Sequence, residues 1–254
     1  MLTRSSTHRI VLGYGEDLAY VHDAGFSHFA QGVSPGLLRI LKLHGVREGL
    51  IVDLGCGSGR WARELIKVGY EVLGIDQSPA MIKLARKIAP AARFQVATLF
   101  RFDFPACRGV TAIGECFNYC FDKTNSRGAL ARVFKRIYRA LCPGGVLVFD
   151  VAGPDRRPNR GIRMSWSAGK DWAVMSATSA EGEDVLCRRI VCFRRHGRFY
   201  RRTEEVHYLR VYPAGELREE LVRCGFEVRI LKAYGGYRLP RGIAAIVAIK
   251  PPPR

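Results

Sequence analysis

A short segment between residues 50 and 60 restricts the fold of this chain more than any other feature. It reads Leu-Ile-Val-Asp-Leu-Gly-Cys-Gly-Ser-Gly-Arg, so an apolar run leads into three alternating glycines, Gly55, Gly57 and Gly59. Glycine takes positive φ angles readily and lets a ligand approach bare backbone. The next residues have helical spacing, and the start of a helix offers free N–H groups to a polar or anionic ligand. The segment therefore predicts a strand, a tight ligand-binding turn and a helix.

Strand and helix patterns alternate along the chain from about residue 36 to residue 151. Short apolar runs that are typical of buried strands fall at 50–54, 71–75, 93–96, 110–114 and 146–151. Stretches with helical periodicity lie before and between them, at 36–43, 60–68, 79–88 and 129–141. Strands that alternate with helices in this way predict a doubly wound α/β fold with a parallel sheet.

The pattern changes after residue 153. Residues 154–170 are rich in Arg, Gly and Pro and are predicted to form a loop. Antiparallel strands are predicted next, and His196-Gly197 is typical of a hairpin between the last two. These strands fall at 172–178, 185–195 and 198–211, and a helix at 214–223 and strands at 227–233 and 244–249 follow them. We therefore expect a β-rich insertion that covers the open edge of the ligand site.

An acidic residue, Asp76, stands about 20 residues after the glycines, at the end of the next predicted strand. A carboxylate there can accept two hydrogen bonds from a ribose diol. The spacing Gly-x-Gly-x-Gly differs from the dinucleotide-binding Gly-x-Gly-x-x-Gly, and Asp53 precedes the first glycine by two residues. Together with Pro143-Gly144-Gly145 before the fifth strand, these features resemble motifs I and II of class I S-adenosylmethionine-dependent methyltransferases.

This resemblance implies a Rossmann-like sheet of seven strands in the order 3-2-1-4-5-7-6, with strand seven antiparallel. It also implies that the N-terminal segment forms a helical lid. We expect five parts, namely a lid at 1–35, an S-adenosylmethionine-binding core at 36–153, an antiparallel β insertion or cap at 154–212, the C-terminal part of the core at 213–250 and a tail at 251–254.

The resemblance also assigns the cofactor, S-adenosyl-L-methionine, to particular residues. The glycines would line its methionine and ribose, Asp76 would hold the ribose hydroxyls, and Gln77 would lie near the adenine. The full expected cofactor set belongs to motif I, motif II and the ends of strands three and four: Asp53, Gly55, Gly57, Gly59, Asp76, Gln77, Thr98, Leu99 and Glu115.

The segment after the fourth predicted strand supplies candidate catalytic groups, because ligands lie at the carboxyl ends of parallel strands. In the family this position flanks the transferred methyl group. Glu115 is interpreted as a general base or as a ligand for a substrate amine. Asn118 and Tyr119 are candidates to orient the substrate, or alternatively to cap local backbone and pack in the core.

Two further segments are candidates to close the site. In the N-terminal segment, Tyr14 or Tyr20 could face the sulfonium, and His22 or His28 could act as a base; packing roles are the alternative for each histidine.

A strand across residues 203–210 would place Glu205 and His207 on one face, which makes His207 a catalytic candidate. The alternative for this strand is a solvated charge ladder.

The net charge of +18 leaves more than one methyl acceptor open. It arises from 32 Arg and 9 Lys against 23 acidic residues, spread over both halves of the chain, with a dense run from Arg188 to Arg202. Diffuse charge favours a small-molecule acceptor, methylated at O or N, over nucleic acid, so an RNA methyltransferase is the alternative. A non-catalytic S-adenosylmethionine-binding sensor or partner subunit is a further alternative, since an intact glycine turn allows it.

Metal sites and membrane segments have no signal in the sequence. There is no Cys-x-x-Cys pair and no Cys/His cluster with zinc spacing, so no metal is expected. No apolar run approaches the ~20 residues that span a bilayer, and the first residues lack the apolar stretch of a secretory signal. We interpret the eight cysteines as reduced residues of a cytoplasmic protein. The identity of the methyl acceptor and the oligomeric state stay open.

Overall fold

A seven-stranded sheet forms the centre of the computed structural model, which describes residues 14–122 and 124–252. Its strand order is β3-β2-β1-β4-β5-β13-β10. The strands are β1 (Leu50–Leu54), β2 (Glu71–Asp76), β3 (Arg93–Val96), β4 (Cys107–Ala112), β5 (Leu141–Ala152), β10 (Glu227–Leu231) and β13 (Ile243–Ile249). Strands β1 to β5 run parallel, whereas β13 is antiparallel to both β5 and β10. The predicted order and the antiparallel strand seven are thereby confirmed.

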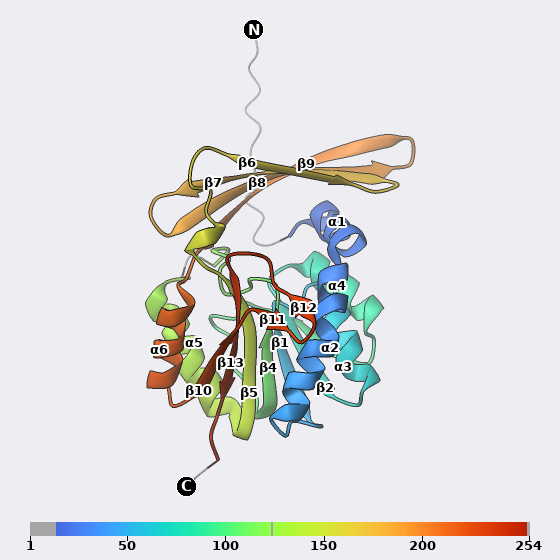
Figure 1. The fold of residues 1–254 in the computed structure, drawn as a ribbon. Coiled ribbons are helices and arrows are strands. Elements are labelled where there is room, and N and C mark those ends of the chain that lie inside the picture. Colours follow the sequence, from blue (N-terminus) through green and yellow to red (C-terminus); the bar gives the residue numbers. More distant parts are fainter. Residues whose placement is uncertain (1–13, 123, 253–254) are drawn as a thin grey trace.

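Helices cover both faces of this sheet (Figure 1). On one face lie α2 (His28–Leu43), α3 (Arg60–Lys67) and α4 (Pro79–Ile88), and on the other α5 (Arg127–Ala140) and α6 (Ala214–Arg223). Alternate side chains of a strand point to opposite faces. Accordingly, Val146 and Val148 of β5 pack with α2 and α3, whereas Leu147 and Phe149 pack with α5 and α6. Burial on both faces explains why the strands read as continuous apolar runs.

Local signals place the ends of several elements. The Ser78 side chain accepts a hydrogen bond from the Met81 N–H at 3.1 Å, and Pro79 occupies the first turn of α4, as the Ser-Pro pair predicts. Gly225 follows α6 with φ of 101°, which a residue with a side chain rarely adopts. The helix predicted at 36–43 begins eight residues earlier, at His28, and contains Pro35. Burial of Val33 on the same face as the later turns outweighs the local cost of proline.

The insertion forms a four-stranded antiparallel sheet in the order β6-β7-β8-β9. Its strands are β6 (Arg163–Ala168), β7 (Trp172–Glu181), β8 (Val185–His196) and β9 (Phe199–Arg210), and we call residues 163–210 the insertion sheet. The prediction of a loop over 154–170 was wrong for residues 163–168, which pair with β7 from Arg163↔Thr178 to Ala168↔Ala173. Its residues alternate between polar and apolar, but Met164 and Trp166 are 66% and 79% exposed, so pairing with β7 rather than burial of an apolar face forms this edge strand.

The insertion sheet lies across the carboxyl ends of the core strands, with α1 (Glu16–Phe26) beneath it (Figure 1). Short elements complete the described chain: η1 (Pro154–Arg156) after β5, and the hairpin of β11 (Ala233–Tyr234) and β12 (Tyr237–Arg238). Within the described residues, no helix combines the length and apolarity needed to cross a bilayer.

Candidate active site

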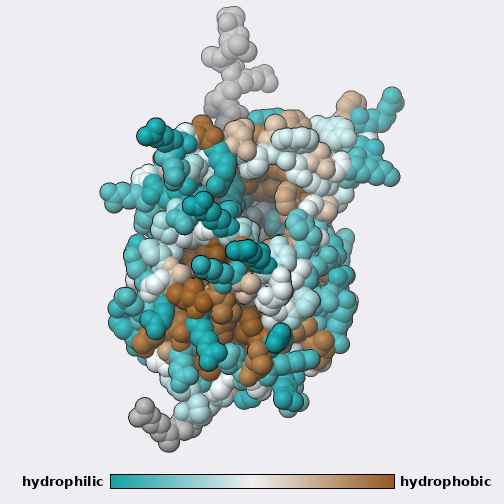
Figure 2. All heavy atoms as spheres, in the orientation of Figure 1, coloured by the Kyte–Doolittle hydropathy of each residue, from teal (hydrophilic) through white to brown (hydrophobic). Residues whose placement is uncertain are grey.

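A cavity of about 800 Å³ lies between the core strands, α1 and the insertion sheet. The space-filling view shows a hollow at this level, between the insertion sheet and the core (Figure 2). The carboxyl ends of β1, β2, β4 and β5 supply one wall, α1 a second, and β6, β7 and β8 the roof. The ligand site therefore lies at the sheet edge that parallel α/β topology predicts.

The glycine turn, residues 55–59, forms the floor of this cavity at the end of β1. Gly55, Gly57 and Gly59 have φ angles of 63°, 53° and 78°, in the left-handed region that favours glycine. A Cβ atom on Gly55 would lie 2.6 Å from the Cys116 Sγ atom, whereas one on Gly57 would meet no described atom within 4 Å. Gly55 is thus required by packing, and Gly57 leaves backbone open toward the cavity.

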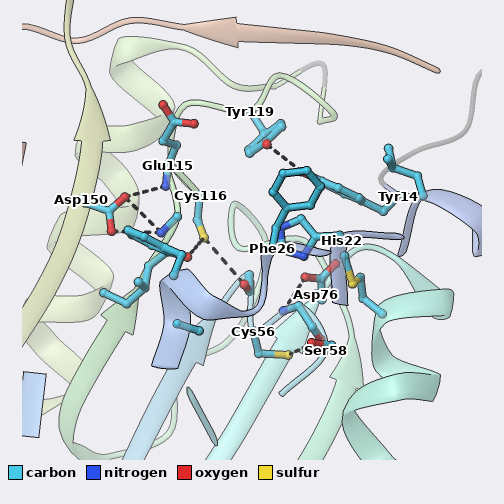
Figure 3. Close-up of a pocket in the computed structure, with 18 of the residues that line it drawn as sticks. Tyr14, His22, Phe26, Cys56, Ser58, Asp76, Glu115, Cys116, Tyr119 and Asp150 are labelled. Atoms are coloured by element: carbon cyan, nitrogen blue, oxygen red, sulfur yellow. Dashed lines mark hydrogen bonds between the residues drawn. The ribbon is translucent and has the colours of Figure 1, made fainter. Parts of the chain in front are cut away.

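Asp76 is hydrogen-bonded to this turn. Its Oδ2 atom accepts the Gly57 N–H at 3.0 Å, and its Oδ1 atom accepts the Ser78 N–H at 2.8 Å. Burial raises the pKa of Asp76, although these two N–H groups lower it in part. Asp76 lines the cavity (Figure 3), and so does Gln77. Because each carboxylate oxygen can accept more than one hydrogen bond, Asp76 retains capacity for a ligand hydroxyl.

Asp53 lies deeper, below the glycine turn, and is 2% exposed. Its Oδ1 atom accepts the Thr111 hydroxyl at 2.7 Å, and the Trp61 indole N–H donates to the same hydroxyl at 3.1 Å. Burial raises the pKa of Asp53 to about 7. Asp53 lines the cavity and at the same time ties β1 to β4.

The two residues predicted after β3 have different positions. Leu99 lines the cavity and is 7% exposed, whereas Thr98 is not among the lining residues. The Thr98 hydroxyl donates to the Asp122 carboxylate at 2.8 Å and accepts the Phe100 N–H at 3.3 Å. The Thr98 side chain therefore stabilises the loop after β3 and does not face the cavity.

Helix α1 is fixed to the glycine turn by an ion pair. Arg60 Nε lies 2.8 Å from Asp23 Oδ1, and the Ser58 hydroxyl donates to the same oxygen at 2.6 Å. His22, the residue before Asp23, lines the cavity, and burial lowers its pKa to about 4. His28 is exposed and is not among the lining residues, so only His22 of the two predicted histidines reaches the cavity.

The end of β4 is held by Asp150, which the sequence analysis did not single out. The Gly114 and Glu115 N–H groups donate to its carboxylate at 3.0 and 2.7 Å (Figure 3). Burial raises the pKa of Asp150 to about 6, and the Tyr234 hydroxyl donates to it at 3.3 Å. A lone acid in the apolar run 146–151 was the signal that could have identified it.

Glu115 projects into the cavity from a strained backbone position. Its φ is 61°, and among the described non-glycine residues it is the one with positive φ. Its carboxylate lies between two guanidinium groups, with Arg156 Nε and Arg188 Nη2 each 3.7 Å from an oxygen. The structure thus places Glu115 opposite two cations of the insertion.

Asn118 does not line the cavity and is fully buried. Its amide nitrogen donates to the carbonyl oxygens of Ala152 and Arg210, at 3.0 and 2.6 Å, and its amide oxygen accepts the Ala152 N–H at 3.0 Å. These hydrogen bonds join β5 and β9 across the loop after β4. The geometry favours the capping role that was the alternative for Asn118, and disfavours contact with a substrate.

Tyr14 and Tyr119 meet at the cavity wall. Their hydroxyl oxygens lie 2.8 Å apart, and both residues line the cavity (Figure 3). Burial raises the pKa of both phenols, that of Tyr14 well above its usual range. His207 stands behind them, with its ring centroid 5.1 Å from that of Tyr14 and its Nε2 atom 2.8 Å from a Glu205 oxygen. His207 and Glu205 do share a face, but His207 is not a lining residue.

Tyr20 is turned away from the cavity. Its hydroxyl donates to the Asp171 carboxylate at 2.7 Å, and the Arg194 guanidinium lies 3.8 Å from its ring centroid. Asp17 of the same helix, whose side chain is 1% exposed, pairs with Arg201 at 2.5 Å and with Arg194 at 3.4 Å. Part of the basic run 188–202 therefore holds α1 beneath the insertion sheet.

Comparison with known proteins finds methyltransferases among the proteins similar to this chain. A family model described as a methyltransferase domain matches residues 51–145. A Bacillus subtilis (strain 168) protein designated methyltransferase YqeM is 27% identical over 73% of this chain and 76% of its own length. The trans-aconitate 2-methyltransferase of Paracidovorax citrulli (strain AAC00-1) is 32% identical over 48% of this chain and 46% of its own length. The chain thus spans three quarters of one relative and less than half of the other.

Among solved structures, the sugar N-methyltransferase KedS8 from Streptoalloteichus sp ATCC 53650 has a TM-score of 0.77. It is 22% identical, and the superposition covers 99% of this chain and 98% of that one. The shared fold thus includes the insertion sheet. The fold is that of Rossmann-like methyltransferases. Together with the methyltransferase domain matched over residues 51–145 and the methyltransferase relatives, it supports a class I S-adenosylmethionine-dependent methyltransferase.

Proposed function

We propose that this enzyme transfers a methyl group to an oxygen or nitrogen of a small molecule held under the insertion sheet. The observation that carries the proposal is the cavity itself, which has the glycine turn and Asp76 at one end and Glu115 with the insertion sheet at the other. Two of the proteins compared above are named for small-molecule substrates, trans-aconitate and a sugar. An acceptor enclosed in this way would be screened from water, which methyl transfer requires.

The residues at the floor fit the methyl donor. Gly57 offers backbone without a side chain, and Asp76 has hydrogen-bonding capacity for ribose hydroxyls after binding two N–H groups. We assign Asp53, Gln77 and Leu99, which also line this end, to the same subsite. When bound, S-adenosylmethionine supplies an electrophilic methyl group on a sulfonium, and the thioether is left behind after transfer.

The opposite end of the cavity carries the groups that can orient the acceptor. We assign Glu115 to hold the reacting O–H or N–H group and to take its proton as the methyl group is transferred. The phenols of Tyr14 and Tyr119 remain protonated because burial raises their pKa. One of them donates to the other, so the second can donate a hydrogen bond to the acceptor. Positioning of this kind supplies up to roughly 7–11 kcal/mol of a transfer barrier, so no covalent nucleophile is needed.

Methyl-labelled S-adenosylmethionine tests the proposal. The purified protein is incubated with labelled donor and a cell extract, and the products are separated by size before and after nuclease treatment. We expect label in small molecules that nuclease does not alter. Label in large, nuclease-sensitive material would instead establish the RNA alternative, and donor binding without any transfer would favour the sensor alternative.

A further inference from the structure

Three arginine side chains line the acceptor end of the cavity. Arg156 comes from η1, Arg163 from β6 and Arg188 from β8. Partial desolvation and the adjacent positive charges of Arg156 and Arg188 lower the pKa of Arg163, as expected where cations crowd together. Three of the arginines of the insertion are therefore gathered at the acceptor end of the cavity.

The acids of the cavity do not balance these cations. Glu115 lies within 4 Å of Arg156 and Arg188, but at 3.7 Å neither pair is a normal hydrogen bond. Asp150 is the next acid along this wall, and its carboxylate accepts hydrogen bonds from the main-chain N–H groups of Gly114 and Glu115. Three guanidinium groups thus face one carboxylate.

A buried guanidinium N–H group at this end lacks a hydrogen-bond acceptor. Within the described part of the chain, Arg156 Nε is buried and makes no hydrogen bond, and the nearest carboxylate oxygen, Glu115 Oε1, lies 3.7 Å away. Among the described residues, the Arg188 side chain, which is 19% exposed, makes one hydrogen bond, of 3.4 Å to the Tyr119 hydroxyl, besides its pair with Glu115 at 3.7 Å. Buried guanidinium N–H groups are costly without an acceptor, so Arg156 and Arg188 indicate that an acceptor is missing, and the excess of cations at this end favours an anionic one.

The arginines are held where they are. The aliphatic part of Arg156 packs so closely on Gly242 that a Cβ atom there would lie 2.9 Å from Arg156 Cγ. The Arg163 side chain donates to the Arg156 carbonyl oxygen at 3.1 Å, and β8 pairs Arg188 with His207 of β9. Such pre-positioned guanidinium forks match the geometry of carboxylate and phosphate oxygens.

We propose that the methyl acceptor is an anionic small molecule, and that Arg156, Arg163 and Arg188 bind its carboxylate or phosphate group while the reacting atom faces Glu115. The inference rests on the proposed function, since it names the chemical class of that acceptor. It also gives a role to arginines that sequence composition alone does not distinguish from the remaining basic residues.

Separation by charge tests the class of acceptor without knowledge of its identity. The small-molecule fraction of a cell extract is divided on an anion exchanger at pH 8, and each part is incubated with enzyme and methyl-labelled S-adenosylmethionine. We expect the acceptor in the retained part, and phosphatase treatment then distinguishes phosphate from carboxylate. An acceptor in the unretained part would overturn the inference but leave the proposed function intact. Transfer to neither part would contradict the proposed function itself.

Arginine variants test the residues. Arg188→Gln and Arg163→Gln should each raise the apparent KM for the retained acceptor at least tenfold, with the Kd for S-adenosylhomocysteine unchanged. Arg163 is exposed at the surface, so its variant should fold even if that of Arg188 does not. Arg189→Gln is the matched control, because it removes the same charge from the exposed face of β8. Equal KM values in all three variants, or a loss confined to S-adenosylhomocysteine binding, would refute the assignment.

Discussion

The Gly57 N–H donates to the Asp76 carboxylate at 3.0 Å, so the glycine turn and the acid of the next strand form one hydrogen-bonded unit. The same carboxylate also fixes Ser78, which caps α4. A substitution at Asp76 therefore acts on the donor site and on the backbone that shapes it.

Asp76→Asn should weaken binding of S-adenosylhomocysteine by about 10- to 100-fold, because hydrogen bonds to a charged group contribute about 1.5–3 kcal/mol. Isothermal titration calorimetry gives the Kd directly. Asp103→Asn, which removes an exposed carboxylate elsewhere, should bind as the wild type does. An unchanged Kd for Asp76→Asn would show that the ribose assignment is wrong.

Gly55→Ala should destabilise the fold by about 2–4 kcal/mol, because it combines a left-handed φ with a clash against Cys116. Gly57→Ala has a similar φ but open space, so it should cost about 1–2 kcal/mol. Urea unfolding measures both. Replacing Cys116 by Ala in the Gly55→Ala background should recover part of the loss. Equal losses for the two glycine variants would argue against the packing explanation.

Asn118→Ala should lower the free energy of unfolding by about 3 kcal/mol, because buried main-chain groups of Ala152 and Arg210 lose their partner. Denaturant titration provides this value. At a temperature where the variant is folded, its affinity for S-adenosylhomocysteine and its KM for the acceptor should match those of the wild type. A large rise in KM without loss of stability would restore the substrate-orienting role of Asn118.

Glu115→Gln should reduce kcat by about 10²- to 10⁴-fold, the usual contribution of a positioned proton acceptor, because the amide keeps the shape but accepts no proton. Steady-state assays with the labelled donor measure the effect, and binding of S-adenosylhomocysteine should persist. Glu181→Gln, at an exposed position of the insertion sheet, serves as the control. If kcat stayed within twofold, Glu115 would have no part in proton transfer.

Burial of neutral His22 makes stability depend on pH. Its pKa of about 4 lies below the ordinary value of 6.5, so the unfolded chain takes up the proton first and stability falls as the pH drops from 6.5 toward 4. His22→Phe should remove about 2 kcal/mol of this loss, measured by urea unfolding at pH 4.5 relative to pH 8. At pH 8 the His22 imidazole is neutral in both the folded and the unfolded chain, so the free energy of unfolding at pH 8 is the internal reference. Parallel profiles for the two proteins would contradict the burial of His22.

Features that depend on neighbouring residues in the chain were predictable. The glycine turn, the Ser78 cap and the alternation of apolar runs follow from φ preferences and side-chain periodicity, which act over a few residues. These local features were enough to predict a parallel sheet. The order of its seven strands was predicted from the family resemblance. Asp76 was identified for the same reason, since its place is set by the length of one strand–helix–strand unit.

Other features depended on how distant segments pack. Tyr14 and Tyr119 are 105 residues apart in sequence, and Glu115 meets Arg156 and Arg188 only because the insertion sheet folds back over the carboxyl ends of the core strands. Strand β6 leaves its large apolar side chains exposed and forms by pairing with β7. Whether a polar side chain such as Asn118 hydrogen-bonds to the main chain or faces the cavity depends on the groups that pack around it. The sequence by itself therefore determined the glycine turn proposed to bind the methyl donor, whereas the tertiary structure decided which side chains form the acceptor end.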